Sequence, residues 1–229
     1  MIKFNINWYN KFIQSTNEKK LLVHKISDIL IGKPHNSCLE IGLGTSPYFA
    51  QQLAKNFSKY VIVERQLTNA QLPSNVTLIN NDWEKVDLDE KYDIIIASHV
   101  VYYFKDKKSA IDKILTTFNE GGRAIFVVNG KKADYGPLKL AFSKMIGSPY
   151  IFTYEVLLKI LQNKEINEYT LPSEIRFSSF DELFNVLYLL FDNYPAEYQK
   201  FKGDIINYLQ QHITNNKFII EQKIIEVRK

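Results

Sequence analysis

The chain has 229 residues, which is long enough for one large α/β domain with a buried core. Its 29 basic and 25 acidic residues leave a net charge of only +4, and basic pairs such as Lys19 and Lys20 are typical of solvated surface, so a nucleic-acid partner is not indicated. No stretch reaches the roughly 20 apolar residues that span a membrane. Cys38 is the single cysteine and residues 1–10 lack the basic start and apolar run of a secretory signal, so we expect a cytoplasmic protein without disulfides.

Residues 1–33 are predicted to be helical. Apolar residues recur there at helical spacing, as Leu22 and Ile26 illustrate. Gly32 and Pro34 are residue types that end a helix. We therefore expect an N-terminal helical segment before the first strand.

Residues 34–131 alternate short β-branched runs with helical patterns. Strands are expected over residues 37–41, 60–63, 76–79, 92–97 and 124–128, and helices over residues 47–57 and 107–118. Residues 94–96 are three isoleucines in a row, which is typical of a strand buried on both faces. Strands that alternate with helices predict a parallel sheet with right-handed crossovers.

The regular alternation stops after residue 131. Apolar helical segments are expected over residues 138–146, 154–161, 180–191 and 198–213, with a strand-like piece at 168–177. We interpret residues 132–216 as a helical cap over the carboxyl edge of the sheet, where ligands bind in open α/β folds. Residues 217–229 are rich in Ile and are predicted to return to the sheet, so residues 1–229 form one expected domain.

A glycine-rich turn follows the first predicted strand. Gly42 and Gly44 allow a tight turn and a close approach of the backbone to a ligand. Ser46 stands near the place of the third glycine in the dinucleotide fingerprint, which a pyrophosphate requires. Glu40 precedes the first glycine by two residues, where it would meet an ammonium group. Glu64 ends the second predicted strand about 20 residues later, the usual place of a carboxylate that binds a ribose.

Each of these residues also has a purely structural interpretation. Gly42 and Gly44 would then only form a tight turn, and Glu64 would be a solvated strand end. Asp82 would be a helix N-cap for the segment after it. Trp83 would belong to the core.

Four landmarks in order resemble class I S-adenosylmethionine-dependent methyltransferases over residues 36–130. They are Glu-x-Gly-x-Gly from Glu40, then Val63-Glu64, Asn81-Asp82-Trp83 and Tyr92-Asp93-Ile94-Ile95. The resemblance implies a doubly wound, Rossmann-like α/β fold with a seven-stranded sheet, an N-terminal helical segment and a helical cap.

The same resemblance implies S-adenosyl-L-methionine as the cofactor. The loop would cradle its amino-acid part, Glu64 would bind the ribose hydroxyls, Asp82 the adenine amino group, and Trp83 would pack beside the ring. The cofactor-binding residues implied in this way are Glu40, Gly42, Gly44, Thr45, Ser46, Glu64, Arg65, Asp82, Trp83 and Ser98. We expect no metal site.

The segment after the fourth predicted strand bears on the methyl acceptor. Base N-methyltransferases carry an Asn/Asp-Pro-Pro-aromatic motif there, whereas residues 97–104 read Ala-Ser-His-Val-Val-Tyr-Tyr-Phe. This difference argues against base methylation and favours a small molecule or a protein side chain.

Two segments resemble histamine N-methyltransferases more narrowly. Residues 102–106, Tyr-Tyr-Phe-Lys-Asp, are similar to the Tyr-Tyr-Val-Lys-Asp segment of that group, with His99 just before. Residues 12–18 are similar to the entry helix turn whose Glu contacts the imidazole amine, and Glu18 is the matching residue. The chain departs from the group in two ways: His99 replaces a substrate-contacting Gln, and the C-terminal Asn contact has no counterpart. The resemblance implies an amine acceptor.

Four candidate catalytic residues follow. Glu18 would orient a cationic amine, and His99 would accept its proton. Tyr102 and Tyr103 would form an aromatic wall near the sulfonium. The structural alternatives are a packed His99, a Glu18 that only opposes a helix dipole, and one tyrosine that points into the core because neighbours on an extended chain face opposite sides.

The favoured function is methyl transfer to a small-molecule acceptor, without a nucleic-acid or membrane partner. A protein- or RNA-directed methyltransferase and a non-catalytic relative that only binds the cofactor remain as alternatives. A short-chain oxidoreductase is disfavoured because the third glycine is missing. The sequence leaves the acceptor and the oligomeric state open.

Overall fold

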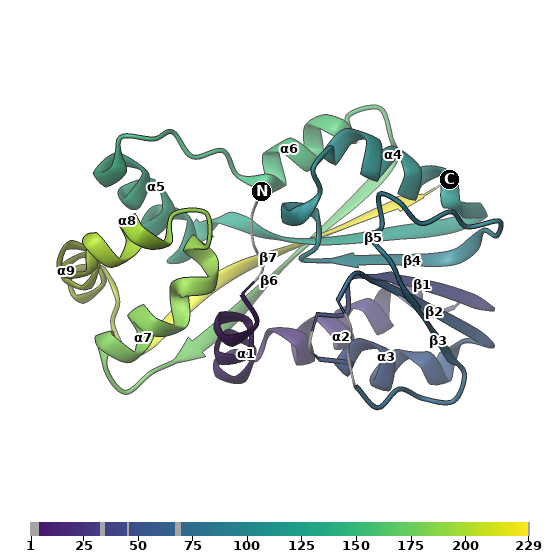
Figure 1. Ribbon diagram of the computed structural model, residues 1–229, viewed down its shortest axis with the longest axis horizontal. Coiled ribbons are helices and arrows are strands. Elements are labelled where there is room, and N and C mark those ends of the chain that lie inside the picture. The colour runs from purple at the N-terminus through teal and green to yellow at the C-terminus, as the bar shows by residue number, and fades with distance from the viewer. Residues whose placement is uncertain (1–4, 33–34, 45, 67–69, 229) are drawn as a thin grey trace.

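The computed structural model describes residues 5–32, 35–44, 46–66 and 70–228. These residues form a seven-stranded sheet with the order β3-β2-β1-β4-β5-β7-β6 (Figure 1). The strands are β1 (Ser37–Ile41), β2 (Lys59–Glu64), β3 (Val76–Asn80), β4 (Tyr92–Ser98), β5 (Phe118–Ala133), β6 (Ile166–Arg176) and β7 (Lys217–Arg228). The first five strands run parallel, β7 is antiparallel to β5, and β6 is antiparallel to β7.

Helices cover both faces of the sheet and one of its ends (Figure 1). The α-helices are α1 (Ile6–Ser15), α2 (Glu18–Leu30), α3 (Tyr48–Leu53), α4 (Lys107–Thr117), α5 (Tyr135–Ile146), α6 (Thr153–Ile160), α7 (Phe180–Val186), α8 (Pro195–Lys200) and α9 (Lys202–His212). Short 3-10 turns are η1 (Ala54–Asn56), η2 (Val101–Tyr103) and η3 (Leu187–Phe191). None of the helices in the described part of the chain is long and apolar enough to cross a bilayer.

Three apolar clusters make up the core. One packs α4 and α6 on a face of the sheet, through Ile111 and Leu157 among others. A second packs α2 and α3 on the opposite face, where Ile26 and Leu53 are fully buried. The third joins α1 to the cap helices α5, α7 and α9 beyond the carboxyl ends of the parallel strands. Burial of each large aliphatic side chain contributes about 1.5–3 kcal/mol, so these clusters hold the cap to the sheet.

The expected α/β fold with a seven-stranded sheet, an N-terminal helical segment and helices that cap the sheet is confirmed. Two strands differ in extent from the expectation. β5 begins at Phe118 because Gly121 and Gly122 form an irregularity within the strand instead of a turn before it. β6 lies within residues 132–216 but pairs along its whole length with β7, so part of the expected cap range belongs to the sheet.

The N-terminal segment consists of two helices, α1 and α2, with a break between them. Thr16 is extended and forms an isolated bridge with Ile175 of β6. The side chain of Asn17 accepts a hydrogen bond from the Glu174 amide at 2.9 Å. The break therefore attaches the chain to β6 and makes Glu18 the first residue of α2. Gly32 follows the last turn of α2 as expected, and Pro34 lies outside the described residues.

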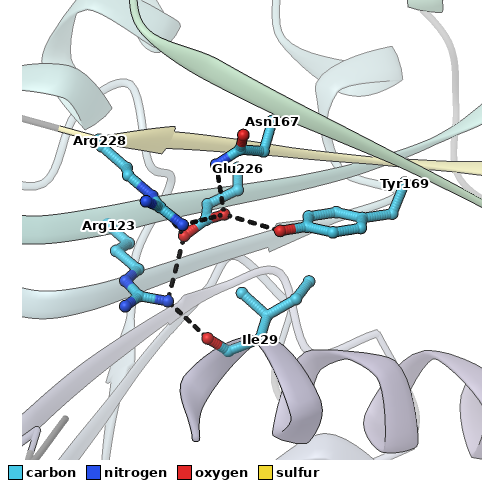
Figure 2. A network of polar contacts seen from close by, with 6 residues as sticks. All are labelled: Ile29, Arg123, Asn167, Tyr169, Glu226 and Arg228. Carbon is cyan, nitrogen blue, oxygen red and sulfur yellow. Dashed lines mark hydrogen bonds and ion pairs between the residues drawn. The ribbon is translucent and has the colours of Figure 1, made fainter. Parts of the chain in front are cut away.

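A buried carboxylate joins the last two strands (Figure 2). Glu226 of β7 is 0% exposed, and Arg228 donates to both of its oxygens at 3.0 and 3.2 Å. Asn167 and Tyr169 of β6 donate to the same group at 3.0 and 3.1 Å. Although burial raises it, these hydrogen bonds hold the pKa of Glu226 below its ordinary value.

Arg123 extends this network from β5 to α2 (Figure 2). Its guanidinium lies 3.1 Å from the Glu226 carboxylate and donates at 2.5 Å to the carbonyl of Ile29. Ile29 is in the last turn of α2, where backbone carbonyls have no partner within the helix. A cation is favourable at that end of a helix. The network therefore fixes the carboxyl end of α2 against the sheet.

Replacement of Glu226 tests this network. Glu226→Gln should lower the free energy of unfolding by about 3 kcal/mol at neutral pH, because it leaves two arginines without their buried counter-ion. Since the folded-state pKa of Glu226 is lowered, the loss should shrink as the pH falls through that pKa. Denaturant unfolding measures both effects, with Glu197→Gln on the exposed surface of α8 as the control. Equal stability of the two variants would contradict the role of the network.

Candidate functional site

A cavity of about 360 Å³ lies at the carboxyl edge of the parallel strands. Its walls come from α1, the first turn of α2, the glycine loop after β1, the residues that follow β2 and β4, and the cap. Its charged and polar lining includes Glu18, Lys19, Glu40, Glu64, Arg65, Asp82, Ser98, His99, Asn129, Lys139 and Asp192. The cavity therefore brings most of the sequence-predicted site residues together.

The glycine loop is held between two other segments. Gly42 and Gly44 have φ of +83° and +63°, a region that favours glycine. A Cβ at Gly42 would lie 3.0 Å from Val100, and one at Gly44 would lie 2.8 Å from the ring of Tyr9 in α1. The loop thus requires glycine for its backbone conformation and for close packing. Thr45 lies outside the described residues.

Glu64 anchors the same loop. One carboxylate oxygen accepts hydrogen bonds from the amides of Leu43 and Gly44 at 2.8 and 2.9 Å, and the other accepts from the Gln66 amide at 2.8 Å. The residue is 6% exposed, so the interpretation as a solvated strand end is wrong. The parallel register places Ile41 beside Val63, which brings the loop and the carboxylate side by side.

The buried Glu40 and the half-buried Lys19 are groups of opposite charge beside the loop. Burial raises the pKa of Glu40 to about 7, although a hydrogen bond from Tyr60 at 2.8 Å and the nearby Lys19 oppose the rise. Burial lowers the pKa of Lys19, and its ammonium donates to the carbonyl of Ser46 at 3.3 Å. Lys19 was predicted to be solvated like Lys20. Helical geometry separates these neighbours by about 100°, so one of them faces the cavity and the other is exposed.

Asp82 and Trp83 lie where the third strand ends. A turn and not a helix follows Asp82, so the alternative interpretation of this residue as a helix cap is wrong. Its side chain accepts a long, 3.4 Å hydrogen bond from the Glu84 amide. Trp83 is 3% exposed, and its indole nitrogen donates to the carbonyl of Ala110 at 3.1 Å. Trp83 is therefore a core residue with an edge on the cavity.

Of the remaining cofactor-binding candidates, Arg65 and Ser98 line the cavity and Ser46 does not. Arg65 lines the cavity, and its guanidinium lies 5.5 Å from the ring centre of Tyr103. Ser98 ends β4 on the lining. Ser46 contacts Lys19 through its backbone carbonyl and is not among the lining residues.

Glu18 and His99 lie close together on the cavity lining. A Glu18 oxygen lies 3.2 Å from His99 Nε2, and the two side chains are 4% and 22% exposed. His99 has φ of +53°, and its amide donates to the Val127 carbonyl at 2.9 Å, so the backbone holds the ring at this place. Glu18 is in the first turn of α2 as expected, but it is buried against other side chains.

A residue of the last strand completes this pair. The Gln222 amide nitrogen donates to the other oxygen of Glu18 at 2.8 Å and to the Ser173 hydroxyl at 2.9 Å. Sequence reasoning missed Gln222. A polar residue among the isoleucines of the terminal strand was the available signal, because a buried polar side chain requires a partner.

Tyr102 and Tyr103 both line the cavity. They belong to the 3-10 turn η2 and not to an extended segment, and Tyr102 also packs against the core cluster that contains Ile111. Tyr102 stacks on His99 with ring centres 6.0 Å apart. The Tyr103 hydroxyl hydrogen-bonds to Asp192 of the cap. The two rings therefore connect the cofactor side of the cavity to the cap.

The cap contributes ionisable groups that sequence reasoning also missed. Burial lowers the pKa of Lys139 to about 7 and raises that of Asp192 to about 6. Tyr135 and Tyr150 lie beside them, with their hydroxyls 3.1 Å apart. Within the described ranges, no group of three or more His, Cys, Asp or Glu side chains is arranged to hold a metal ion.

The anchoring role of Glu64 can be measured directly. In Glu64→Gln, amide hydrogen exchange at Leu43, Gly44 and Gln66 should be about fivefold faster or more, because hydrogen bonds to a charged acceptor are stronger than those to a neutral one. Glu84→Gln is the matched control, since Glu84 accepts from the amides of Lys105 and Asp106. Acceleration of the loop amides in the control, or its absence in Glu64→Gln, would contradict this assignment.

Comparisons with known proteins agree with this architecture. A methyltransferase-domain model matches residues 9–169. An uncharacterized methyltransferase of Bacillus cytotoxicus is 26% identical over 128 residues, which are 52% of this chain and only 60% of that relative. A putative methyltransferase of Bacillus halodurans has a TM-score of 0.61 at 16% identity, over 90% of this chain and 98% of the other.

The N-methyltransferase NodS of Bradyrhizobium japonicum, solved with S-adenosyl-L-homocysteine, has a TM-score of 0.51 at 16% identity, over 93% of this chain and 86% of the other. These structural likenesses show the fold. The segment that matches the family model contains the glycine loop, Glu64 and the pair of Glu18 and His99. The chain belongs to the methyltransferase domain family.

Proposed function

We propose that this protein transfers a methyl group from S-adenosyl-L-methionine to a small-molecule amine. The observation that supports the proposal is that one cavity joins the glycine loop and Glu64 to the pair of Glu18 and His99. The glycine loop and Glu64 would bind the cofactor, and Glu18 and His99 would bind an amine.

The residues around the loop fit the cofactor by their chemistry. Its amino-acid part carries an ammonium and a carboxylate, for which Glu40 and Lys19 offer opposite charges. Glu64 and Asp82 offer carboxylates for the ribose hydroxyls and the adenine amino group. The loop carries no side chains at Gly42 and Gly44 that would keep a ligand from its backbone. When bound, the cofactor supplies a methyl group on a positively charged sulfur.

The chain's own residues then have to present an amine with a free lone pair. Glu18 attracts the amine and orients it, and Gln222 fixes the Glu18 carboxylate from behind. His99 takes the proton that the amine loses. Tyr102 and Tyr103 form an aromatic wall that excludes water and favours positive charge near its faces. Positioning and exclusion of water are the main requirements of this reaction.

The cap side chains that line the cavity favour a small acceptor over a macromolecule. Side chains from α5, α6 and the segment after η3 line it, including Lys139, Val156 and Asp192. A protein or RNA acceptor is the alternative, and transfer of labelled methyl groups into macromolecules of a lysate would favour it. A purely binding relative would bind the cofactor without turnover on any acceptor. Absence of a thermal shift with S-adenosylmethionine and S-adenosylhomocysteine would refute the proposal as a whole.

Cofactor binding should depend on the ionisation of Glu40. The ionised fraction of a carboxyl with a pKa of about 7 rises from about a tenth at about pH 6 to about nine tenths at about pH 8. Because the ionised form pairs with an ammonium, S-adenosylhomocysteine should bind about tenfold more tightly at the higher pH. Calorimetric titration measures this change.

Two variants make this test specific. Glu40→Gln should remove the pH dependence, since it cannot ionise. Tyr60→Phe should move the midpoint to higher pH, because it removes the hydrogen bond that lowers the pKa of Glu40. A pH dependence that survives in Glu40→Gln would show that another group controls binding.

Catalysis should depend on Glu18 and His99. Asn, like His, tolerates the positive φ of this position, so His99→Asn should keep the backbone conformation. It should lower kcat by about 100-fold, because the proton acceptor is lost. Glu18→Gln should mainly raise the KM for a cationic amine. The assay is release of S-adenosylhomocysteine with a panel of amines, phenols and carboxylic acids. His212→Asn on the exposed face of α9 is the control, and full activity of His99→Asn would exclude His99 as the base.

A further inference from the structure

The cap side of the cavity contains a buried ammonium group. Lys139 of α5 is 6% exposed and lines the same cavity as Glu18 and His99. Its ammonium donates a hydrogen bond to the carbonyl of Leu190. It also lies 4.0 Å from the ring centre of Phe191 and 5.0 Å from that of Tyr150. Lys139 is thus a basic group surrounded by aromatic rings on the lining of a ligand cavity.

The surroundings of Lys139 do not fully satisfy it. A lysine ammonium has three N–H donors, and the Leu190 carbonyl is its one hydrogen-bond acceptor among the described residues. Asp192 interacts with it electrostatically but forms no ion pair with it in the described part of the chain. Burial of a charge is costly unless the charge is paired. Two N–H donors therefore remain for a ligand.

Polar side chains connect this group to the proposed amine site. The Tyr102 ring stacks on His99, and the Tyr102 hydroxyl accepts a hydrogen bond from the backbone N–H of Asn129 at 2.5 Å. The side-chain oxygen of Asn129 is buried on the cavity wall without a hydrogen-bond partner among the described residues. The side-chain NH2 of Asn129 donates to the Tyr135 hydroxyl, and the Tyr135 ring centre lies 5.6 Å from the Lys139 amino nitrogen. One wall therefore carries a proton acceptor and carboxylate at one end, a free carbonyl in the middle and a cation at the other end.

We propose that the methyl acceptor is an amine that also bears a carboxylate, and that Lys139 binds this carboxylate. The inference rests on the function proposed above, because the amine end of the molecule would contact Glu18 and His99. A single negative charge suits the subsite, since one lysine with Asp192 nearby cannot balance a doubly charged phosphate. Asn129 would accept a hydrogen bond from the middle of the ligand.

The test compares amines that differ only in an acidic group. Histamine and histidine, or tyramine and tyrosine, differ by a carboxylate, and ethanolamine and phosphoethanolamine differ by a phosphate. The wild type should use a carboxylate-bearing member with kcat/KM about 10- to 100-fold above its partner, which is the effect of a hydrogen bond to a charged group. In Lys139→Met this ratio should fall to about one, whereas Lys139→Arg, which keeps the charge, should retain part of it.

Two measurements separate this role from a structural one. Thermal unfolding and S-adenosylhomocysteine affinity report whether Lys139→Met is folded with an intact cofactor site. Calorimetry on protein saturated with S-adenosylhomocysteine reports binding of each amine without turnover. If carboxylate-bearing amines bind more tightly and Lys139→Met abolishes this preference, the inference is supported. If no amine is methylated, the proposed function is refuted, but the inference about Lys139 still stands on the binding data.

Other outcomes would overturn the inference while the proposed function stands. One is methylation of amines with no preference for the carboxylate. Another is a Lys139→Met variant that lowers binding of both members of a pair equally, which would assign Lys139 to the structure of the cap. A preference for the phosphate-bearing member would replace the carboxylate by a different ligand class.

Discussion

The position of helix α2 is the constraint on which both the sheet and the site depend. Its carboxyl end is held by Arg123, which bonds to the Ile29 carbonyl and to the buried Glu226. Its amino end is held by Glu18, whose carboxylate meets His99 and Gln222. Both ends therefore rest on buried charges whose partners lie on distant strands. A buried carboxylate is stable only when it is paired or hydrogen-bonded. The contacts that stabilise the fold therefore also fix the position of the Glu18 side chain.

The charges in the cavity are separated by the architecture. Glu40, Lys19 and Glu64 surround the glycine loop, Glu18 and His99 form the wall after β4, and the cap adds Lys139. Glu18 and Lys19 come from α2, Glu40 and Glu64 from β1 and β2, His99 from the segment after β4, and Lys139 from α5. They meet because the carboxyl ends of parallel strands converge at one edge while the cap covers them. This arrangement gives one cavity room for a charged cofactor and for an acceptor with charges of its own.

Burial tunes these groups in opposite directions. It raises the pKa of Glu40 and Asp192 and lowers that of Lys19 and Lys139, because an apolar surrounding disfavours the charged form of any of them. The charged form of each of these groups is stabilised when a bound ligand supplies the opposite charge. The cavity is thus prepared for ligands with both signs of charge, as S-adenosylmethionine has.

Local patterns in the sequence determined the alternation of strands and helices, the glycine loop and the carboxylate at the end of β2. These features depend on residues near in sequence or on the regular spacing of a parallel α/β unit, so periodicity and turn chemistry reveal them. Only the tertiary structure decided that Lys19 and Lys139 face the cavity, that both tyrosines of η2 line it, and that Gln222 supports Glu18. Glu18 and Gln222 are 204 residues apart. A helical or strand pattern shows which face of an element is apolar, but the partner of a polar side chain is chosen by packing between distant elements.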